Sequence, residues 1–243
     1  MIKILLVEDD DILGFMLKDG MEMIGDYEVM WCNNAKAGLV AFDTFNPDIV
    51  VSDVEMPGMT GLEMVKIIRE KNANIPIILE TGVSAGKTIV EAYSLGIDNY
   101  IKKPFLPAEL HAYIQGLRRR MEQNTQYVSK VKEENENGSP AHLSDIQIGL
   151  FRFNPKKQSL ESPTTQRELS VTESLLLELL VKNSGDIVTK DLIAEKVWGG
   201  KNFLNYQSLD VFLHNLRKYL AEDTNIVIKT VRGIGYIFEV LGK

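Results

Sequence analysis

The chain contains little cysteine and histidine and no long hydrophobic run. Its single cysteine, Cys32, excludes an internal disulfide bond and is typical of a protein in the reducing cytoplasm. The three histidines are far apart in the sequence and none lies near the cysteine, which argues against a structural zinc site. No apolar run approaches the ~18 residues of a membrane span, and the first residues lack the apolar core and cleavage site of a secretory signal. These absences predict a cytoplasmic protein without a membrane partner.

Acidic residues outnumber basic ones, but not in every part of the chain. The 243 residues carry a net charge of -7, to which residues 1–120 contribute -6, residues 121–140 contribute -2 and residues 141–243 contribute +1. The middle part has too few apolar residues to form a core of its own. At ~100–200 residues per domain, the length fits two domains. We therefore predict an acidic N-terminal domain at 1–122, a linker at 123–140 and a near-neutral C-terminal domain at 141–243.

Short runs of isoleucine, valine and leucine alternate with helical patterns in the first half of the chain. The runs are continuous, as expected for parallel strands that are buried on both faces. Between them, apolar residues recur at the three- and four-residue spacing of helices. Five such units predict an α/β fold with a doubly wound five-stranded parallel sheet, whose ligand site lies at the carboxyl ends of the strands. The predicted strands are 2–7, 27–32, 49–51, 75–79 and 99–102.

Polar side chains follow four of these runs. Glu8 and Asp9 follow the first run, and Asp53 follows the third. Thr81 follows the fourth run and Lys103 the fifth. Parallel strands bring these ends to one edge, where three carboxylates repel one another unless a cation lies between them, and oxygen ligands favour Mg²⁺. A carboxylate held by Mg²⁺ beside an ammonium group can accept a phosphoryl group, because both cations neutralise the charge on the transferring oxygens.

Helix capping is the alternative interpretation of the acidic residues. An aspartate after a strand often caps the helix that follows, so either Asp9 or Asp10 alone fits this structural role. Capping does not account for all five polar residues at the ends of the corresponding strands. The phosphoacceptor hypothesis is therefore the stronger one.

Three segments resemble the receiver domain of two-component response regulators. They are Leu6–Asp9, Ser52–Gly61 and Lys103–Phe105, together with Thr81. The resemblance implies a flavodoxin-like receiver in which a sensor histidine kinase phosphorylates Asp53.

The same resemblance implies a magnesium site around the phosphorylated residue. In the family, Mg²⁺ is held by residues that match Asp9, Asp53 and the backbone carbonyl of Glu55, and the residue that matches Glu8 acts through water. Mg²⁺ is the cofactor expected here.

The resemblance further implies a conformational switch. Thr81 and Tyr100 match the family's switch pair, and Lys103 matches the residue that contacts the phosphoryl group. The Lys103–Pro104 peptide bond is expected to be cis. Phosphorylation is expected to order the loop after Thr81 and to draw Tyr100 inward.

Two enzyme classes are alternatives to a receiver. Residues 82–88 are similar to a phosphate-binding P-loop, but three residues rather than four separate Gly82 from the next Gly-Lys pair. A dehalogenase-type phosphatase needs a second aspartate two residues after Asp53, where this chain has Glu55. We therefore predict that the protein is not an enzyme. A receiver that works without phosphorylation is a third alternative, against which the intact carboxylates, Thr81 and Lys103 argue.

The C-terminal part contains three helix patterns and a final hairpin pattern, which together predict a winged helix-turn-helix domain. The residues Ser170–Glu173 form a capping box at the start of the first helix. The expected strands are 147–153, 159–161, 167–169, 226–231 and 236–240, and the second and third helices are expected to run over 192–198 and from Asn205 or Tyr206 to Leu220.

The third helix carries a stripe of leucines, and residues that we expect on its opposite face are of types that contact bases or phosphates. A solvated helix face is the alternative, because a net charge of +1 gives this domain little electrostatic attraction to DNA. The candidate DNA contacts are Trp198, Gln207, Ser208, Val211, Asn215, Arg217, Lys218, Thr230 and Arg232.

Four segments of this domain resemble the winged-helix effector of the OmpR/PhoB class of response regulators. They are Leu169–Glu173, Glu195–Gly199, Leu216–Lys218 and Thr230–Tyr236. The resemblance implies a phosphorylation-dependent DNA-binding transcriptional regulator. The partners it implies are a sensor histidine kinase, double-stranded DNA with tandem half-sites, a second copy of the chain in a homodimer formed on phosphorylation, and RNA polymerase.

The chain departs from this class on the face that pairs two receivers. Ile89 stands where the class has an arginine, and Asn99, after Asp98, stands where it has a second acid. Basic residues 118–120 remain available opposite them. We expect a dimer contact that is more apolar and less sensitive to salt.

The chain also departs from the class on the recognition helix. Gln207 and Asn215 stand where arginines are usual, and Phe212 stands where histidine is usual. Because Gln and Asn pair well with adenine, we expect the DNA half-site to shift toward A·T pairs. Arg232 lies between the last two strands and is expected to enter a narrow minor groove.

Overall fold

The protein is described by a computed structural model that divides into two compact units, Met1–Gln115 and Gly116–Lys243. Among the described helices, none is long and apolar enough to cross a membrane. The structure describes residues 1–82, 86–132, 145–199 and 203–242, without the side chains of residues 86–89, 120–132 and 203–207.

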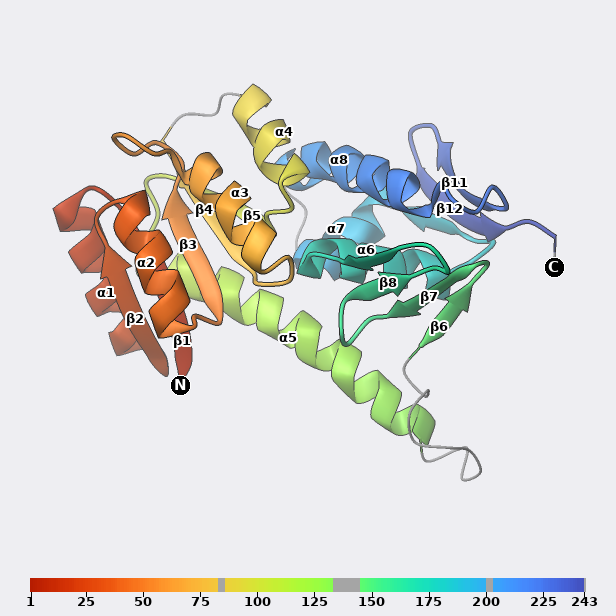
Figure 1. Ribbon diagram of the computed structural model, residues 1–243, viewed down its shortest axis with the longest axis horizontal. Coiled ribbons are helices and arrows are strands. Elements are labelled where there is room, and N and C mark those ends of the chain that lie inside the picture. Colours follow the sequence, from red (N-terminus) through yellow and green to blue (C-terminus); the bar gives the residue numbers. More distant parts are fainter. Residues whose placement is uncertain (83–85, 133–144, 200–202, 243) are drawn as a thin grey trace. The chain divides into compact units, whose positions relative to one another are not determined.

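The first unit contains the predicted five-stranded parallel sheet. Its strands are β1 (Ile2–Val7), β2 (Tyr27–Cys32), β3 (Ile49–Asp53), β4 (Ile77–Thr81) and β5 (Asn99–Lys102), as Figure 1 shows. The strand order is β2-β1-β3-β4-β5, and all neighbouring strands are parallel. This order brings the carboxyl ends of β1, β3, β4 and β5 to one edge of the sheet.

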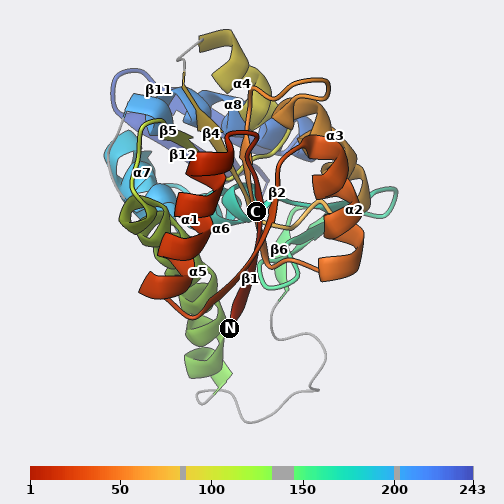
Figure 2. The same ribbon diagram turned by 90° about the vertical axis from the view of Figure 1, so that its left-hand side faces the viewer.

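Helices cover both faces of this sheet. In Figure 2, α1 (Asp11–Ile24) and α5 (Pro107–Lys132) lie on one face, and α2 (Ala35–Phe45) and α3 (Gly61–Lys71) lie on the other. The connection from β4 to β5 contains α4 (Gly86–Ser94). Leu17 and Met21 of α1 and Leu110 and Ile114 of α5 pack with strand residues in one buried cluster. Burial of each such side chain stabilises the fold by about 1.5–3 kcal/mol, so the sheet is a rigid support for its polar edge.

Helix α5 extends beyond the predicted end of the first domain. It continues to Lys132, so residues 123–132 of the expected linker are helical, and residues 133–144 lie outside the described part of the chain. The segment is polar, but its glutamate, glutamine, lysine and arginine residues have good helix propensity. Polar composition therefore did not indicate the helical secondary structure of residues 123–132.

In the described residues, the second unit contains two antiparallel sheets and three helices in addition to the C-terminal part of α5. A four-stranded sheet is formed by β6 (Ile146–Ile148), β7 (Phe151–Asn154), β8 (Ser159–Glu161) and β9 (Gln166–Glu168). The helices are α6 (Val171–Lys182), α7 (Lys190–Trp198) and α8 (Phe203–Leu220). The second sheet has the order β10-β12-β11 and is formed by β10 (Ile187–Thr189), β11 (Ile226–Val231) and β12 (Gly235–Val240). Helices α6 to α8 and the β11–β12 hairpin confirm the predicted winged helix-turn-helix.

Three details of this unit differ from the prediction. The expected strand 147–153 is a hairpin, because Gly149 adopts a left-handed φ of 54° and turns the chain between β6 and β7. Strand β10 is only three residues long and was not predicted. Helix α8 begins at Phe203, before the expected start at Asn205 or Tyr206.

Asp223 connects the β6–β7 turn to the segment after α8. Its carboxylate accepts hydrogen bonds from the backbone N–H groups of Leu150 (2.8 Å) and Asn225 (3.0 Å). These two hydrogen bonds lower the pKa of Asp223 below its ordinary value of 3.8. The ionised form is therefore bound more tightly by the folded chain than the neutral form.

We expect Asp223→Ala to destabilise the second unit in a pH-dependent way. A carboxyl whose pKa is lower in the folded than in the unfolded state stabilises the fold fully above the unfolded pKa of about 3.9. This contribution is lost as the pH falls through the folded pKa. Urea unfolding followed by Trp198 fluorescence at a series of pH values should show that the difference from wild type shrinks below about pH 4. The exposed Asp186→Ala is the matched control, and a pH-independent difference contradicts the assignment.

Candidate phosphoacceptor site and nucleic-acid interface

Three carboxylates meet at the carboxyl edge of the five-stranded sheet. Glu8 and Asp9 follow β1, and Asp53 ends β3, so the strand order places them side by side. One carboxylate oxygen from each lies within 4.8 Å of the other two. Glu8 and Asp53 are buried, and Asp9 is the most exposed of the three. Their close approach needs a compensating positive charge.

Helix capping is carried out by Asp10 and not by its neighbours. The Asp10 side chain accepts hydrogen bonds from the N–H groups of Ile12 (2.9 Å) and Leu13 (3.0 Å) at the start of α1. Glu8 and Asp9 are not needed as caps. This separates the structural role of Asp10 from the carboxylate cluster and removes the capping alternative for Asp9.

Lys103 supplies positive charge to the cluster. Its Nζ donates hydrogen bonds to Oε2 of Glu8 and Oδ2 of Asp53, each at 2.5 Å. Burial lowers the pKa of Lys103, but the hydrogen bonds and charges of Asp53 and Glu8 outweigh burial and leave the pKa raised. Lys103 therefore stays an ammonium ion at neutral pH. Its peptide bond to Pro104 is cis, as the resemblance implied.

A fourth carboxyl group, Glu80, lies beside this site and was missed by the sequence analysis. It is directly opposite Asp53 in the β3–β4 register, and its side chain is fully buried. Its Oε2 lies 3.9 Å from Nζ of Lys103. Burial raises the pKa of Glu80 well above its ordinary value, although the charge of Lys103 opposes this shift. The predicted strand 75–79 stopped one residue before it.

The loop after β3 fixes the orientation of Asp53. The N–H of Glu55 donates to Oδ1 of Asp53 at 3.1 Å, which leaves Oδ2 to Lys103. Gly61, the first residue of α3, packs so tightly here that a Cβ atom would lie 2.0 Å from the backbone oxygen of Asp53. Only glycine fits this position.

The two expected switch residues are both buried. Thr81 ends β4 and Tyr100 lies in β5, next to that strand. The Tyr100 ring packs near that of Tyr93 in α4, with ring centroids 6.5 Å apart. We expected phosphorylation to draw Tyr100 inward, whereas the side chain is already inside the protein, at 2% exposure.

The residues expected on the receiver-pairing face have roles inside the first unit. Asp98 is buried, pairs with Arg69 at 3.4 Å and accepts a hydrogen bond from the N–H of Ile77. Asn99 is buried, and its side chain accepts from the N–H of Tyr100. Neither side chain is exposed on the surface of this unit, and the expected dimer contact stays a prediction. The side chains of Ile89 and Arg120 lie outside the described residues.

The exposed face of helix α8 differs from the predicted one. Ser208 is completely buried, and Trp198 at the end of α7 is buried against Phe212. Asn215 donates its amide to Oε1 of Glu173 at 3.2 Å and thereby joins α8 to α6. Ser208 and Trp198 are therefore interior groups and Asn215 is half-buried, because α8 packs against α6, α7 and β11 and not only through its leucine stripe. The side chain of Gln207 lies outside the described part of the chain.

The remaining candidates lie on or near the surface. Lys218 and Arg217 are exposed near the end of α8, and Val211 is half-buried. Arg217 donates to the backbone oxygen of Ile228 and to Oγ1 of Thr230, which connects the helix to the first strand of the hairpin.

His214 and Arg232 complete the exposed groups around α8. His214 is exposed one turn before Lys218 and was not predicted, because the expected outer face was rotated toward Asn215. Arg232 is exposed at the tip between β11 and β12, beside Gly233, which has a φ of 75°. The described surface of α8 and the hairpin therefore offers four basic groups, Arg217, Lys218, Lys229 and Arg232, together with His214, and Lys229 is paired with Glu239.

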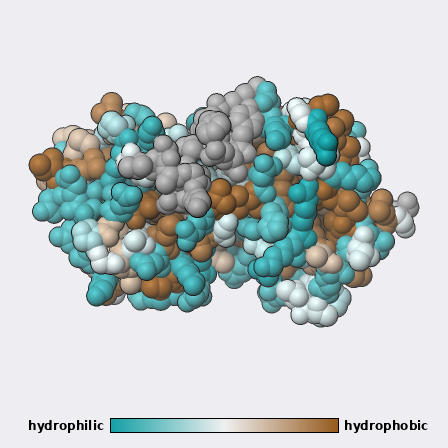
Figure 3. All heavy atoms as spheres, turned by 90° about the horizontal axis from the view of Figure 1, so that it is seen from above, coloured by the Kyte–Doolittle hydropathy of each residue, from teal (hydrophilic) through white to brown (hydrophobic). Residues whose placement is uncertain are grey.

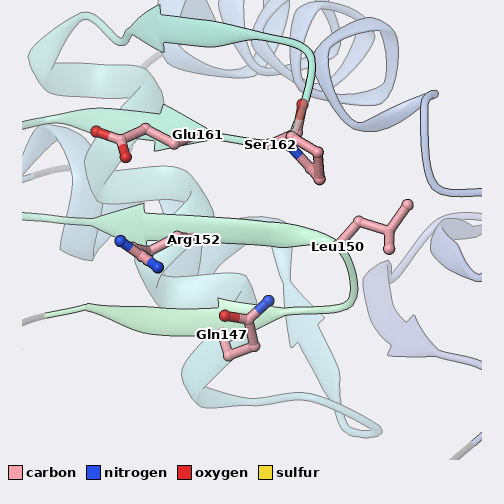
Figure 4. A pocket seen from close by; sticks show the side chains of 6 residues that line it. Gln147, Leu150, Arg152, Glu161 and Ser162 are labelled. Carbon is pink, nitrogen blue, oxygen red and sulfur yellow. The ribbon is translucent and has the colours of Figure 1, made fainter.

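A hollow of about 280 Å³ lies on the four-stranded sheet of the second unit. Arg152 and Glu161 face it from the paired strands β7 and β8 (Figure 4). Its wall combines one basic, one acidic and several neutral side chains. It contains none of the candidate DNA contacts. The lining residues are Gln147, Leu150, Arg152, Glu161, Ser162 and Pro163.

Comparisons with known proteins agree with both parts of this geometry. Residues 4–115 match the response regulator receiver domain, and residues 164–238 match the C-terminal domain of transcriptional regulatory proteins. The chain is 34% identical to the transcriptional regulatory protein RprY of Bacteroides fragilis (strain YCH46), over 97% of this chain and 93% of that protein. The chain is a response regulator of the OmpR/PhoB class.

Other relatives of this response regulator extend over similar lengths. It is 30% identical to the alkaline phosphatase synthesis transcriptional regulatory protein PhoP of Bacillus subtilis (strain 168), over 98% of this chain and 96% of that protein. A RitR mutant shares its fold with a TM-score of 0.75 at 21% identity, covering 98% and 99% of the two chains. The relatives are transcriptional regulators, so the response regulator is not an enzyme, and the P-loop and phosphatase alternatives are set aside.

We expect Asn215→Ala to act on the stability of the response regulator and not on DNA sequence preference. The change removes a hydrogen bond to the buried carboxylate of Glu173 and should lower the free energy of unfolding of the second unit by about 1–2 kcal/mol. Urea unfolding followed by tryptophan fluorescence measures this loss, with the exposed Asp186→Ala as control. A variant of unchanged stability that discriminates less at one base position shows instead that Asn215 reads a base.

Proposed function

We propose that this response regulator accepts a phosphoryl group on Asp53 from a sensor histidine kinase and thereby controls its binding to DNA in the cytoplasm. The observation that carries the proposal is the position of the Asp53 carboxylate next to the Lys103 ammonium and within 4.8 Å of carboxylate oxygens of Glu8 and Asp9. Oδ2 of Asp53 bonds Lys103 and Oδ1 bonds the N–H of Glu55, so both oxygens have a fixed direction.

The carboxylate cluster fits a magnesium ion. Its three carboxylate oxygens within 4.8 Å of one another are hard ligands of the kind that Mg²⁺ prefers, and partial exposure of the cluster leaves room for water ligands. Asp9, Asp53 and the backbone carbonyl of Glu55 would hold the ion, with Glu8 acting through water. When bound, the ion supplies charge neutralisation for the transferring phosphoryl oxygens.

The residues of the chain would perform the transfer as follows. An oxygen of the Asp53 carboxylate attacks the phosphorus of a phosphohistidine in the kinase. A P–O bond forms, the P–N bond breaks, and the released imidazole nitrogen takes up a proton. Lys103 donates hydrogen bonds to the oxygens of the transferred group. The hydroxyl of Thr81, at the end of β4, donates another hydrogen bond to the same group.

Apolar side chains beside the site support a protein donor. Ile12, Phe15 and Met16 of α1 are exposed, one to two turns after the acidic Asp9. The surface of the first unit, on the left in Figure 3, carries hydrophobic patches among hydrophilic areas. A kinase that presents a phosphohistidine to Asp53 covers the surface next to Asp9. We infer that these side chains of α1 contact the kinase.

We also propose that helix α8 and the β11–β12 hairpin contact tandem DNA half-sites. His214, Lys218 and Arg232 are the exposed groups that support this placement. Lys218 is suited to a phosphate, His214 to a base edge in the major groove, and Arg232 to the narrow minor groove beside it. Homodimerisation on phosphorylation and contact with RNA polymerase stay predictions from the family.

We expect Asp53→Asn to abolish acyl-phosphate formation while the fold is retained. Asparagine keeps the shape of aspartate but is a poor nucleophile and removes one charge from the cluster. Incubation with a radiolabelled small phosphodonor and Mg²⁺ measures labelling, and thermal unfolding verifies the fold. Asp10→Asn is the matched control, because Asp10 caps α1 and should remain labelled. Full labelling of Asp53→Asn contradicts the site assignment.

We expect Lys218→Ala and Arg232→Ala to weaken DNA binding in different ways. Loss of a phosphate contact by Lys218 should lower affinity evenly for all sequences. It should also reduce the slope of log affinity against log salt concentration by about one. Loss of Arg232 should weaken binding most where the flanking DNA is an A-tract, whose minor groove is narrow. Binding to randomised half-sites at several salt concentrations measures both effects. Lys156→Ala, in the turn between β7 and β8, is the control, and equal behaviour of all three variants contradicts the placement.

A further inference from the structure

Glu80 is a buried carboxyl group for which the proposed phosphoryl transfer has no role. It lies in β4 after Ile77, Ile78 and Leu79, which are all fully buried and apolar. Both of its carboxylate oxygens are buried, and neither has a hydrogen-bond partner in the described part of the chain. A buried polar group without hydrogen bonds costs folding free energy, and an apolar side chain here would avoid that cost. Stability therefore gives no reason for a glutamate at this position.

The surroundings of Glu80 connect it to Lys103. Glu80 lies directly opposite Asp53 in the sheet, and its Oε2 is 3.9 Å from Nζ of Lys103. An ammonium group has three N–H donors. Glu8 and Asp53 each accept one of them at 2.5 Å. Glu80 thus provides the third carboxyl group within 4 Å of the ammonium.

A phosphoryl group on Asp53 brings new acceptors to the same ammonium. Its oxygens compete with the existing carboxyl groups for the N–H donors of Lys103. At 3.9 Å the Glu80 carboxyl oxygen does not accept a hydrogen bond from the ammonium, but it attracts the ammonium toward the sheet and so away from phosphoryl oxygens added to Asp53. The phosphorylated state is then less stabilised by Lys103 than it would be beside an apolar residue at position 80.

We propose that Glu80 is a positioning residue that holds the Lys103 ammonium toward strand β4 and thereby shortens the lifetime of phosphorylated Asp53. The inference rests on the proposed phosphorylation of Asp53. It assigns to Glu80 no contact with the phosphoryl group itself, because the effect passes through Lys103. An acceptor oxygen at this position is sufficient for the effect.

Two variants of equal length separate the oxygen from the rest of the side chain. Glu80→Gln keeps an oxygen that can accept from Lys103, whereas Glu80→Met has nearly the same length and only a weakly accepting sulfur. Both side chains are uncharged, so a difference in phosphoryl lifetime between the two variants is due to the acceptor oxygen and not to the charge. Ile78→Val, two residues earlier in β4, is the control for repacking of the strand.

The full-length protein and these variants are phosphorylated with a radiolabelled small phosphodonor and Mg²⁺, and the decay of the label is followed after the donor is removed. Glu80→Met should lengthen the half-life by roughly threefold to fivefold, the factor that corresponds to losing about 0.7–1 kcal/mol of attraction between a polar oxygen and the ammonium. Glu80→Gln and Ile78→Val should stay close to the wild type. Thermal unfolding should show Glu80→Met to be at least as stable as the wild type.

Binding of beryllofluoride in the presence of Mg²⁺, measured by ¹⁹F NMR, gives a second readout that involves no hydrolysis. Glu80→Met should bind this phosphoryl mimic more tightly by the same factor as its half-life increases. Equal values for Glu80→Gln and Glu80→Met, or a half-life of Glu80→Met at or below that of the wild type, overturn the role of Glu80. A wild-type protein that takes up neither label nor beryllofluoride overturns the proposed function instead.

Discussion

The ammonium group of Lys103 among buried carboxylates is the interaction on which the first unit depends. Like charges at this distance repel strongly, so Glu8 and Asp53 can share the edge of the sheet only with positive charge between them. The arrangement requires the ends of β1, β3 and β5 to stay in register, and the long apolar strands provide that rigidity. A phosphoryl group on Asp53 adds negative charge and therefore changes the balance between the carboxylates and the Lys103 ammonium. Thr81 at the end of β4 and Tyr100 in the neighbouring strand β5 are both buried, and they stay the residues proposed to respond to this charge.

The arrangement of the phosphoacceptor residues could be predicted because two simple regularities cooperate there. Continuous apolar runs identify parallel strands, and parallel strands bring their carboxyl ends together. Glu80 escaped the prediction for the same reason, since a strand buried on both faces was assumed to end at its last apolar residue. Asp98 was assigned to the receiver-pairing face by its correspondence with the class, whereas Arg69 and the N–H of Ile77 make its burial inside the unit favourable. A charged side chain such as Asp98 can be buried when it has a partner distant in the sequence, and composition does not identify that partner.

The recognition helix shows a similar limit of periodicity. A leucine stripe defines one buried face, and the opposite face was taken to be exposed. Helix α8 instead packs against several elements, so its buried arc is wider than the stripe and includes Ser208, while Asn215 is half-buried and bonded to Glu173. The capping box at the start of α6 was predicted as a local motif. Its Glu173 also accepts hydrogen bonds from Asn215 and from the hydroxyl of Tyr219, which no local rule includes.

Glu173 and Glu80 are both buried glutamates, and the difference between them separates a structural from a functional role. Glu173 accepts hydrogen bonds from Ser170, Asn215 and Tyr219, so its burial is compensated and fixes α8 against α6. Glu80 has no such hydrogen bonds, and its nearest charged neighbour is already bonded to two other carboxylates. A protein selected for stability alone would replace Glu80 with an apolar residue. Its presence next to Asp53 and Lys103 is consistent with a site in which part of the folding stability is given up to control how long a phosphoryl group remains bound.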